Sequence, residues 1–257
     1  MTRNPARGDD DRLRLNQFLS RAGHGSRRGV ESLVRQGRVT IDGEVVRDLA
    51  RRVDPSAETV AVDGMVARLP RHFRVYAFHK PLGVVSSLRG QGQQVDLAAL
   101  RERAGIDPRF HPVGRLDQDS SGLLLWTDDG TLSQALLRPG HEVWKTYRIV
   151  LGNALGRGLE RTLAGGTLEL DGRPVRPCHL EADPGGDRRR WTIRLQEGRN
   201  RQIRRMLAAV GARVVALERV AFGPIELGRL RPGDFRRLTE REDQALREVA
   251  GRTDRSS

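Results

Sequence analysis

The chain has 257 residues, enough for one medium-sized domain and a smaller one, each with its own core. Its 46 Lys and Arg against 33 Asp and Glu give a formal charge of +13, which favours a polyanionic partner, nucleic acid first. The single cysteine excludes an intrachain disulfide and a cysteine zinc cluster, and no apolar run is long enough to span a membrane, so we expect a cytoplasmic protein without membrane contact.

The start of the chain has the pattern of a small independent unit. Apolar residues recur at helical spacing across residues 15–22, and Ser26 is placed to cap a second helix that ends at Gly37. Two short alternating segments follow around Asp42-Gly43, a dipeptide typical of a tight hairpin. This order predicts a compact helix-helix-strand module.

Strands and helices are interleaved in the rest of the chain. Strands are predicted at 73–78, 84–86, 123–126, 144–151, 168–170, 175–180 and 190–195, and helices at 95–104, 131–137, 200–211 and 239–257. Hairpin turns such as Asp171-Gly172 favour antiparallel pairing, so we expect an α+β fold with a mixed, largely antiparallel sheet and flanking helices, rather than a doubly wound α/β fold.

The same pattern predicts where the chain divides. The expected segments are a disordered N-terminus (1–12), the helix-helix-strand module (13–62), a linker (63–72), a larger α+β domain (73–240) and a C-terminal helix and tail (241–257).

The densest run of special residues is 111–125, which places Asp117 between a glycine turn and the apolar segment 123–125. Desolvation at such a position strengthens electrostatic interactions, and a basic neighbour can hold the carboxylate ionised, as a reacting aspartate requires. The simpler alternative is an ordinary loop aspartate that caps a turn.

A calcium loop is a second alternative for the same run. Oxygen ligands would stand at the first, third, fifth and twelfth places of the template, with a glycine at the sixth: Asp117, Asp119, Ser121, Asp128 and Gly122. The twelfth ligand is normally a bidentate Glu, and the flanks lack paired amphipathic helices, so we do not expect a metal here.

A basic run at 197–207 follows the last predicted strand. A helix starting at Asn200 would bury Ile203 on its apolar stripe and leave Arg201 and Arg204 off it, where they could bind phosphate or a carboxylate. The alternative is a solvated basic face.

Aromatic residues make up only 4% of the chain, too few for a broad base-stacking platform. Recognition is therefore expected to depend on charge, shape and a few placed rings. Tyr147 lies in a predicted strand, where a core role is the simpler alternative, and Trp126 and Trp144 are expected to be core residues. No histidine stands at metal-ligand spacing apart from the adjacent pair Cys178-His179, which we interpret as structural.

Taken together, these runs resemble the RsuA/RluB group of bacterial ribosomal RNA pseudouridine synthases. The family patterns are G-R-L-D-x-x-T/S-x-G-L-L, K-T-Y and E-G-R-N-R-Q-I-R-R-M, met in order by residues 114–124, 145–147 and 197–206. The first module resembles the alpha-L RNA-binding module, whose pattern is met by residues 14–28 and 37–43.

The resemblance implies isomerisation of a specific uridine to pseudouridine in ribosomal RNA, with the large subunit favoured and no cofactor. It implies that Asp117 is the nucleophile, attacking either the anomeric carbon or the uracil ring, after the target base has flipped out. It further implies that Arg204 pairs with Asp117, and that Tyr147 stacks on the base and takes part in the late proton removal.

The resemblance also implies RNA contacts outside this triad. Ile203 is expected beneath the target base and Arg115 in the gap that the base leaves. The full set of expected RNA-binding residues is Arg14, Arg27, Arg28, Arg115, Arg199, Arg201 and Ile203. The expected partner is ribosomal RNA or a pre-ribosomal particle, bound by a monomer. Small-subunit RNA, another RNA, and a non-catalytic role in ribosome assembly remain open as alternatives.

Overall fold

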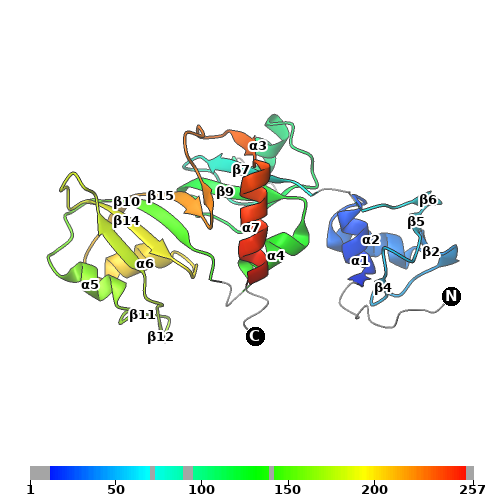
Figure 1. The fold of residues 1–257 in the computed structure, drawn as a ribbon, viewed down its shortest axis with the longest axis horizontal. Coiled ribbons are helices and arrows are strands. Elements are labelled where there is room, and N and C mark those ends of the chain that lie inside the picture. Colours follow the sequence, from blue (N-terminus) through cyan, green and yellow to red (C-terminus); the bar gives the residue numbers. More distant parts are fainter. Residues whose placement is uncertain (1–11, 70–72, 89–94, 139–141, 253–257) are drawn as a thin grey trace. The chain divides into compact units, whose positions relative to one another are not determined.

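The structure is a computed structural model that describes residues 12–69, 73–88, 95–138 and 142–252 (Figure 1). The chain divides into two compact units, residues 1–73 and 74–257. The expected disordered N-terminus falls outside the described residues except for Arg12, as does the tail beyond residue 252.

The first unit begins with the two predicted helices, α1 (Leu15–Arg21) and α2 (Arg27–Arg35). The Ser26 side-chain oxygen accepts a hydrogen bond from the Gly29 N–H at 3.1 Å, which satisfies one of the free donors at the start of α2. The helices bury Phe18 and Val30 in a core shared with the following strands. The predicted cap and helix order are confirmed.

Strands β2 (Val39–Ile41), β3 (Glu44–Val45), β5 (Val60–Val62) and β6 (Met65–Val66) form a four-stranded sheet in the order β3-β2-β5-β6. A separate pair joins β1 (Leu13–Arg14) to β4 (Arg52–Val53). Asp63-Gly64 forms a hairpin turn with positive φ at both residues, as Asp42-Gly43 does. The module therefore continues through β6, into the segment expected to be linker.

The second unit is built on a nine-stranded sheet in the order β13-β14-β10-β15-β9-β7-β17, with β16 and β8 paired to β15 and β9. Its strands are β7 (Val75–Lys80), β8 (His111–Pro112), β9 (Ser121–Thr127), β10 (Lys145–Leu151), β13 (His179–Ala182), β14 (Arg190–Leu195), β15 (Val214–Phe222), β16 (Ile225–Glu226) and β17 (Phe235–Arg237). A small hairpin of β11 (Glu169–Leu170) and β12 (Arg173–Pro174) stands apart. Every pairing along this sheet is antiparallel except β9 with β15, which confirms the α+β expectation.

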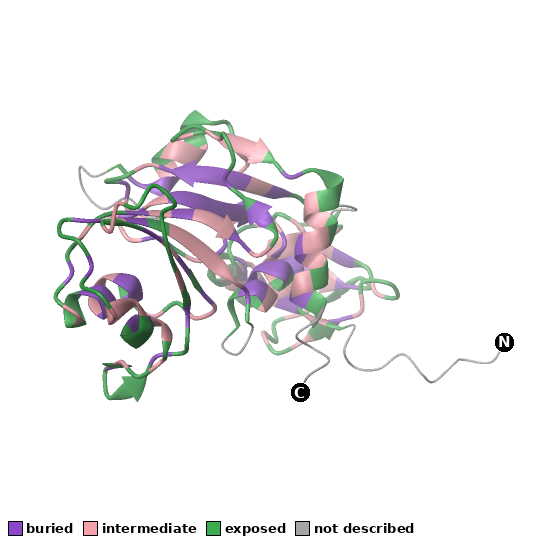
Figure 2. Ribbon diagram, turned by 60° about the vertical axis from the view of Figure 1, so that its left-hand side comes forward, coloured by how far each residue is buried: buried purple, intermediate pink, exposed green. Residues whose placement is uncertain are grey.

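Helices lie on both faces of the sheet of the second unit, each over part of it. They are α3 (Leu97–Arg103), α4 (Gly130–Leu137), α5 (Leu159–Ala164), α6 (Gln202–Ala209) and α7 (Glu240–Arg252). Buried side chains of α5 and α6 pack with those of β10 and β14, whereas α4 and α7 pack with β7 and β9, so the central strands are largely buried (Figure 2). None of the helices in the described ranges is long and apolar enough to cross a membrane.

Several elements differ from the sequence prediction, and three of them bear on the central part of the sheet and its cover. The segment 84–86 forms only a single bridge, Val85 to Asp96, rather than a strand. The central strand β15 and the short helix α5 were not predicted. In β15 the charged pair Glu218-Arg219 interrupts the apolar pattern that marks a buried strand.

Gly122 lies where three strands meet. It pairs with Lys80 of β7 on one side and with Arg219 of β15 on the other, at a φ of 105°. A Cβ atom at this position would lie 2.3 Å from the Arg219 carbonyl oxygen and 2.6 Å from its nitrogen. Only glycine therefore permits this approach of two backbones.

We expect Gly122→Ala to destabilise the second unit by roughly 3 kcal/mol or more, because backbone atoms must move apart. Gly172→Ala is the matched control. Gly172 also has a positive φ, but no atom lies within 4 Å of the position that its Cβ would take. This change should therefore lower the free energy of unfolding by only about 1 kcal/mol. Urea unfolding followed by tryptophan fluorescence measures the effect, because all three tryptophans lie in this unit. Equal losses in the two variants would contradict the steric argument.

Candidate active site

Asp117 lies in the turn between β8 and β9 and is half-buried. The turn is closed by the Ser120 N–H, which donates to the Asp117 carbonyl at 3.1 Å. Residues 113–114 precede it as a bend in which Gly114 has a φ of 77°. The glycine turn expected before Asp117 is therefore present.

A neighbouring loop holds this turn through two reciprocal pairs of hydrogen bonds. Ser86 Oγ donates to the Leu116 carbonyl at 2.5 Å and accepts from the Leu116 N–H at 3.2 Å. The Gly83 N–H donates to the Gln118 carbonyl at 2.8 Å, and Gln118 Nε2 donates to the Gly83 carbonyl at 3.1 Å. The loop after β7 therefore fixes the residues on both sides of Asp117.

Lys80 supports the same turn from within the protein. Its side chain is fully buried, and Nζ donates to the carbonyls of Ser120 at 2.7 Å and Pro81 at 2.9 Å. Burial lowers the pKa of Lys80 to about 8, although the charges of Asp117 and Asp119 act in the opposite direction. Sequence reasoning missed Lys80 as a site residue. The available signal was that it is one of only two lysines among 46 basic residues.

Asp119 binds two arginines of the segment that leads into α6. Arg201 donates to both carboxylate oxygens, at 3.0 and 2.7 Å, and Arg204 Nε lies 3.2 Å from Asp119 Oδ2. Arg204 Nη2 also donates to the Asp119 carbonyl. These contacts, first the hydrogen bonds from Arg201, hold the pKa of Asp119 below its usual range.

The partner of Arg204 is therefore Asp119, and the expected pair of Arg204 with Asp117 is not present. Both arginines make their carboxylate contacts with Asp119, two residues after Asp117 in the same turn. Among the described residues, no hydrogen bond or ion pair involves the Asp117 carboxylate. The hydrogen bond with Asp119 is the main cause that raises the pKa of Arg201, and the charge of Asp117 acts in the same direction.

Tyr147 lies in β10 and is half-buried. It packs against two hydrophobic clusters, one of which contains Ile203 of α6 and the other Leu116. The ring therefore lies between the segments that carry Asp117 and Arg204. Ile203 itself is 5% exposed and is mainly a core residue of α6.

Lys145, the second lysine, begins β10 two residues before Tyr147. Its Nζ donates to the Gln196 carbonyl at 2.6 Å. Burial lowers the pKa of Lys145 to about 8, and the charge of Arg219 acts in the same direction. Both lysines of the chain thus lie at the strands that form the site.

The remaining expected RNA contacts separate into free and occupied side chains. Arg115 is exposed, and no interaction within the described residues involves its side chain. Arg14 and Arg28 are exposed in the first unit, and the side chain of Arg27 lies outside the described part of the structure. Three of the RNA-binding arginines that the resemblance implied, Arg14, Arg28 and Arg115, are thus exposed.

The expectation that Arg199 contacts RNA is corrected by the structure. The guanidinium of Arg199 donates to the carbonyls of Leu170, Arg173 and Pro174, and its Nε lies 3.2 Å from Glu197. These bonds fasten the β11-β12 hairpin to the start of α6. Arg199 therefore has a structural role, because most of its donors are already used within the protein.

The calcium alternative is not supported by the structure. Ser121 and Gly122 lie in strand β9, Asp119 is bound by arginines, and Asp128 accepts from the Arg74 N–H at 2.8 Å. These residues do not converge on a common point. Within the described ranges, no three acidic, histidine or cysteine side chains are grouped so that they could hold a metal ion.

Comparison with known proteins places the two units in known families. Residues 74–209 match the family described as RNA pseudouridylate synthase, and residues 13–58 match the S4 domain. Each match lies within one of the two units of the structure.

Relatives of similar length share most of the chain. An uncharacterized RNA pseudouridine synthase of Mycobacterium bovis is 42% identical over 93% of this chain and 94% of its own length. The ribosomal large subunit pseudouridine synthase B of Bacillus subtilis is 35% identical over 92% and 96%. A crystal structure of a pseudouridylate synthase matches with a TM-score of 0.64 and 28% identity, over 91% of this chain and 99% of that one.

The buried ammonium of Lys80 predicts a pH-dependent stability difference between the wild type and Lys80→Met. Below pH 8 the folded wild type carries a desolvated charge, and between pH 8 and 10.5 it releases that proton before the unfolded chain does. The unfolded state then binds more protons, so the stability of the wild type should rise relative to the variant, by about 2 kcal/mol between pH 7 and 10.

Urea unfolding at several pH values measures this difference. Arg161→Met is the control, because Arg161 is exposed and a guanidinium does not titrate in this range. A stability difference for Lys80→Met that stays constant with pH would contradict the burial of the charged amine.

Proposed function

The chain belongs to the RNA pseudouridylate synthase family, and on that premise we propose that it converts one uridine of large-subunit ribosomal RNA to pseudouridine, with Asp117 as the nucleophile. Its activity class, pseudouridine synthesis on RNA, follows from the family. The choice of RNA and the role of each residue are the proposal.

One observation carries the assignment of Asp117. The motif offers two carboxylates, and Asp119 is bound by Arg201 and Arg204, whereas the Asp117 carboxylate makes no such bond among the described residues. A carboxylate whose oxygens are bound by two guanidinium groups is a weaker nucleophile than one whose oxygens are free of such bonds. Asp119 and its arginines then form the support that fixes the turn, and Asp117 is the group free to react.

The reaction exchanges one bond of the nucleotide for another. The bond between N1 of uracil and C1′ of ribose breaks, and a bond between C5 and C1′ forms, while a proton leaves C5 and N1 gains one. No electrons are exchanged with a partner, so side chains alone can supply the chemistry. Asp117 attacks either C1′ or the uracil ring, and in both cases the half-buried carboxylate reacts where water is restricted.

Tyr147 and Ile203 are proposed to position the target base. The Tyr147 ring lies between the segments of Asp117 and α6, so a flipped uracil can stack on it while its ribose faces Asp117. Tyr147 is also proposed to assist the removal of the C5 proton. Arg115, exposed beside Asp117, is proposed to contact the RNA from which the base was extruded.

The proposed RNA target follows from two similarities. The Bacillus subtilis relative is named for the large ribosomal subunit, and the first unit matches the S4 domain. Exposed Arg14 and Arg28 of that unit offer guanidinium groups to phosphate, and α2 begins beside Arg28 with its positive helix end.

Asp117→Asn tests the nucleophile. We expect it to lower pseudouridine formation by roughly 1,000-fold or more, since an amide cannot form the covalent intermediate, with RNA affinity nearly unchanged. Asp119→Asn is the matched variant and should lower the rate by roughly 10-fold, because it loosens the turn without removing the nucleophile. Carbodiimide primer extension on ribosomal RNA from a deletion strain carrying each variant locates and quantifies the product.

Two results would contradict parts of this proposal. Equal modification by the wild type and Asp117→Asn would exclude Asp117 as the nucleophile. Persistence of every large-subunit pseudouridine in the deletion strain, with loss of one elsewhere, would move the target to the small subunit or to another RNA. Unchanged pseudouridine throughout, with a ribosome assembly defect, would favour the non-catalytic role.

The phosphate contacts of the first unit are tested by salt dependence. Removing Arg14 and Arg28 together should reduce the slope of log affinity against log salt by about 1.4 for two lost contacts to single-stranded RNA. Arg68→Ala, at another exposed arginine of the same unit, controls for the general charge. Filter binding between 50 and 300 mM salt gives both slopes, and identical slopes would remove these arginines from the RNA interface.

A further inference from the structure

Trp144 differs from the other two tryptophans. Trp126 is fully buried and Trp191 is 6% exposed, whereas Trp144, immediately before β10, is only half-buried and is not a full core residue as expected. Its ring centroid lies 5.1 Å from that of His179, and the Arg194 guanidinium carbon lies 5.4 Å from the ring centre. The ring is thus held in place by its neighbours while part of it stays accessible, the arrangement that a stacking side chain requires.

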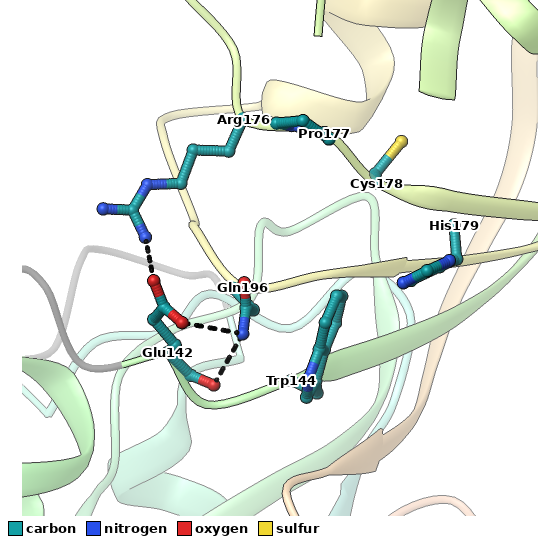
Figure 3. Close-up of a pocket in the computed structure, with 7 residues that line it drawn as sticks. All are labelled: Glu142, Trp144, Arg176, Pro177, Cys178, His179 and Gln196. Carbon is teal, nitrogen blue, oxygen red and sulfur yellow. Dashed lines mark hydrogen bonds and ion pairs between the residues drawn. The ribbon is translucent and has the colours of Figure 1, made fainter. Parts of the chain in front are cut away.

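A pocket of about 310 Å³ adjoins this ring (Figure 3). Its lining residues are Glu142, Trp144, Arg176, Pro177, Cys178, His179 and Gln196. Figure 3 shows Trp144, Gln196 and Glu142 on one side of it and Arg176, Pro177 and Cys178 on the other. The volume is at the lower end of the range for small-molecule sites and suits a single nucleobase.

The polar groups of the pocket retain unused capacity. Arg176 Nη1 donates to Glu142 Oε1 at 3.1 Å, and Gln196 Nε2 donates to Glu142 Oε2 at 3.3 Å. The Gln196 amide oxygen accepts no hydrogen bond from the described residues, and the Arg176 side chain is 49% exposed. The amide oxygen can therefore accept from a ligand, and the remaining guanidinium donors can reach a phosphate.

The pocket opens beside an uncovered face of the sheet. Arg194 pairs with His179 on β13 and with Thr146 on β10, so these residues share one face. Exposed Arg190 and Arg148 lie on that face too, since they alternate with Trp191 and Ile149, which are buried. The opposite face carries Tyr147 and is packed with α5 and α6, so the open face lies outside the catalytic site.

We propose that this open face is a second RNA-binding surface, in which the pocket at Trp144 stacks an unpaired base and the arginines hold its strand. The proposal rests on the proposed function, because the strand is taken to be part of the substrate RNA. A stacking ring, an amide edge and guanidinium groups in one site match a nucleotide, which combines a base, polar edge atoms and a phosphate.

The pocket also predicts which base it prefers. The free acceptor on Gln196 can receive a hydrogen bond from an exocyclic amine, whereas the two carboxylate oxygens of Glu142 already accept from Arg176 and Gln196. Cytosine has such an amine where uracil has a carbonyl oxygen. Cytosine should therefore bind better than uracil, although the catalytic site acts on uridine.

Tryptophan fluorescence of the full chain tests the pocket directly. Single-stranded octamers of cytidine and of uridine are titrated, and stacking on Trp144 should quench the emission, because the other two indoles are buried. We expect the cytidine octamer to bind at least 5-fold more tightly than the uridine octamer. Heparin, a polyanion without bases, should not quench.

Matched variants separate stacking from charge. Trp144→Ala should weaken binding of the cytidine octamer about 10-fold. Trp144→Phe should lose the fluorescence quench but keep the affinity, which is measured by the anisotropy of a labelled octamer. Gln196→Ala should remove the preference for cytosine. Arg161→Ala removes an exposed arginine outside the pocket and should change neither affinity nor preference.

The outcomes distinguish this proposal from the catalytic one. Quenching by heparin equal to that by octamers, or unchanged affinity in Trp144→Ala, would overturn the pocket, even if Asp117→Asn abolishes pseudouridine formation. Quenching by an acidic peptide but by neither octamer would make this a protein-binding surface and would also overturn it. An active Asp117→Asn enzyme with intact cytidine quenching would overturn the nucleophile and leave the pocket.

Discussion

The geometry of the second unit depends on the close approach of three strands at Gly122. The parallel contact of β9 with β15 and the antiparallel contact of β9 with β7 both pass through this residue. It leaves no room for a side chain, and it brings the Ser120 carbonyl to the Lys80 ammonium within the protein. The turn that carries Asp117 ends at this junction, so its position is set by the packing of the strands together with the hydrogen bonds from the loop after β7.

The electrostatics of the site depend on an unequal division of cations between two nearby carboxylates. Arg201 and Arg204 bind Asp119 and tie α6 to the turn. Asp117 keeps its oxygens available, and Lys80 and Arg201 supply positive potential without a direct bond to it. The two carboxylates of this turn therefore differ in their contacts, because Asp119 is bound directly by guanidinium groups and Asp117 meets the nearby positive charges only through space.

Local signals in the sequence predicted local structure well. Ser26, Asp42-Gly43 and the Asn200 region marked a cap, a hairpin and a helix, because each depends on a few adjacent residues. The hairpin at Asp63-Gly64 carried the same signal but was assigned to a linker. Contacts between distant segments could not be read this way: the partner of Arg204, the internal bonds of Arg199 and the burial of Lys80 depend on residues far along the chain. The order of the motifs indicated the family, but not which carboxylate each cation meets.

The second unit has only two side-chain amines, those of Lys80 and Lys145, and they differ in their accessibility. The amine of Lys80 is fully buried and donates hydrogen bonds to two carbonyls, whereas the Lys145 side chain is only half-buried. Acylating reagents attack the uncharged amine, a form that both groups adopt near pH 8. Lys145 is therefore the side-chain amine that such a reagent can reach in the folded chain. Because Lys145 begins β10 two residues before Tyr147, the rate of its acylation measures how accessible this end of the strand is.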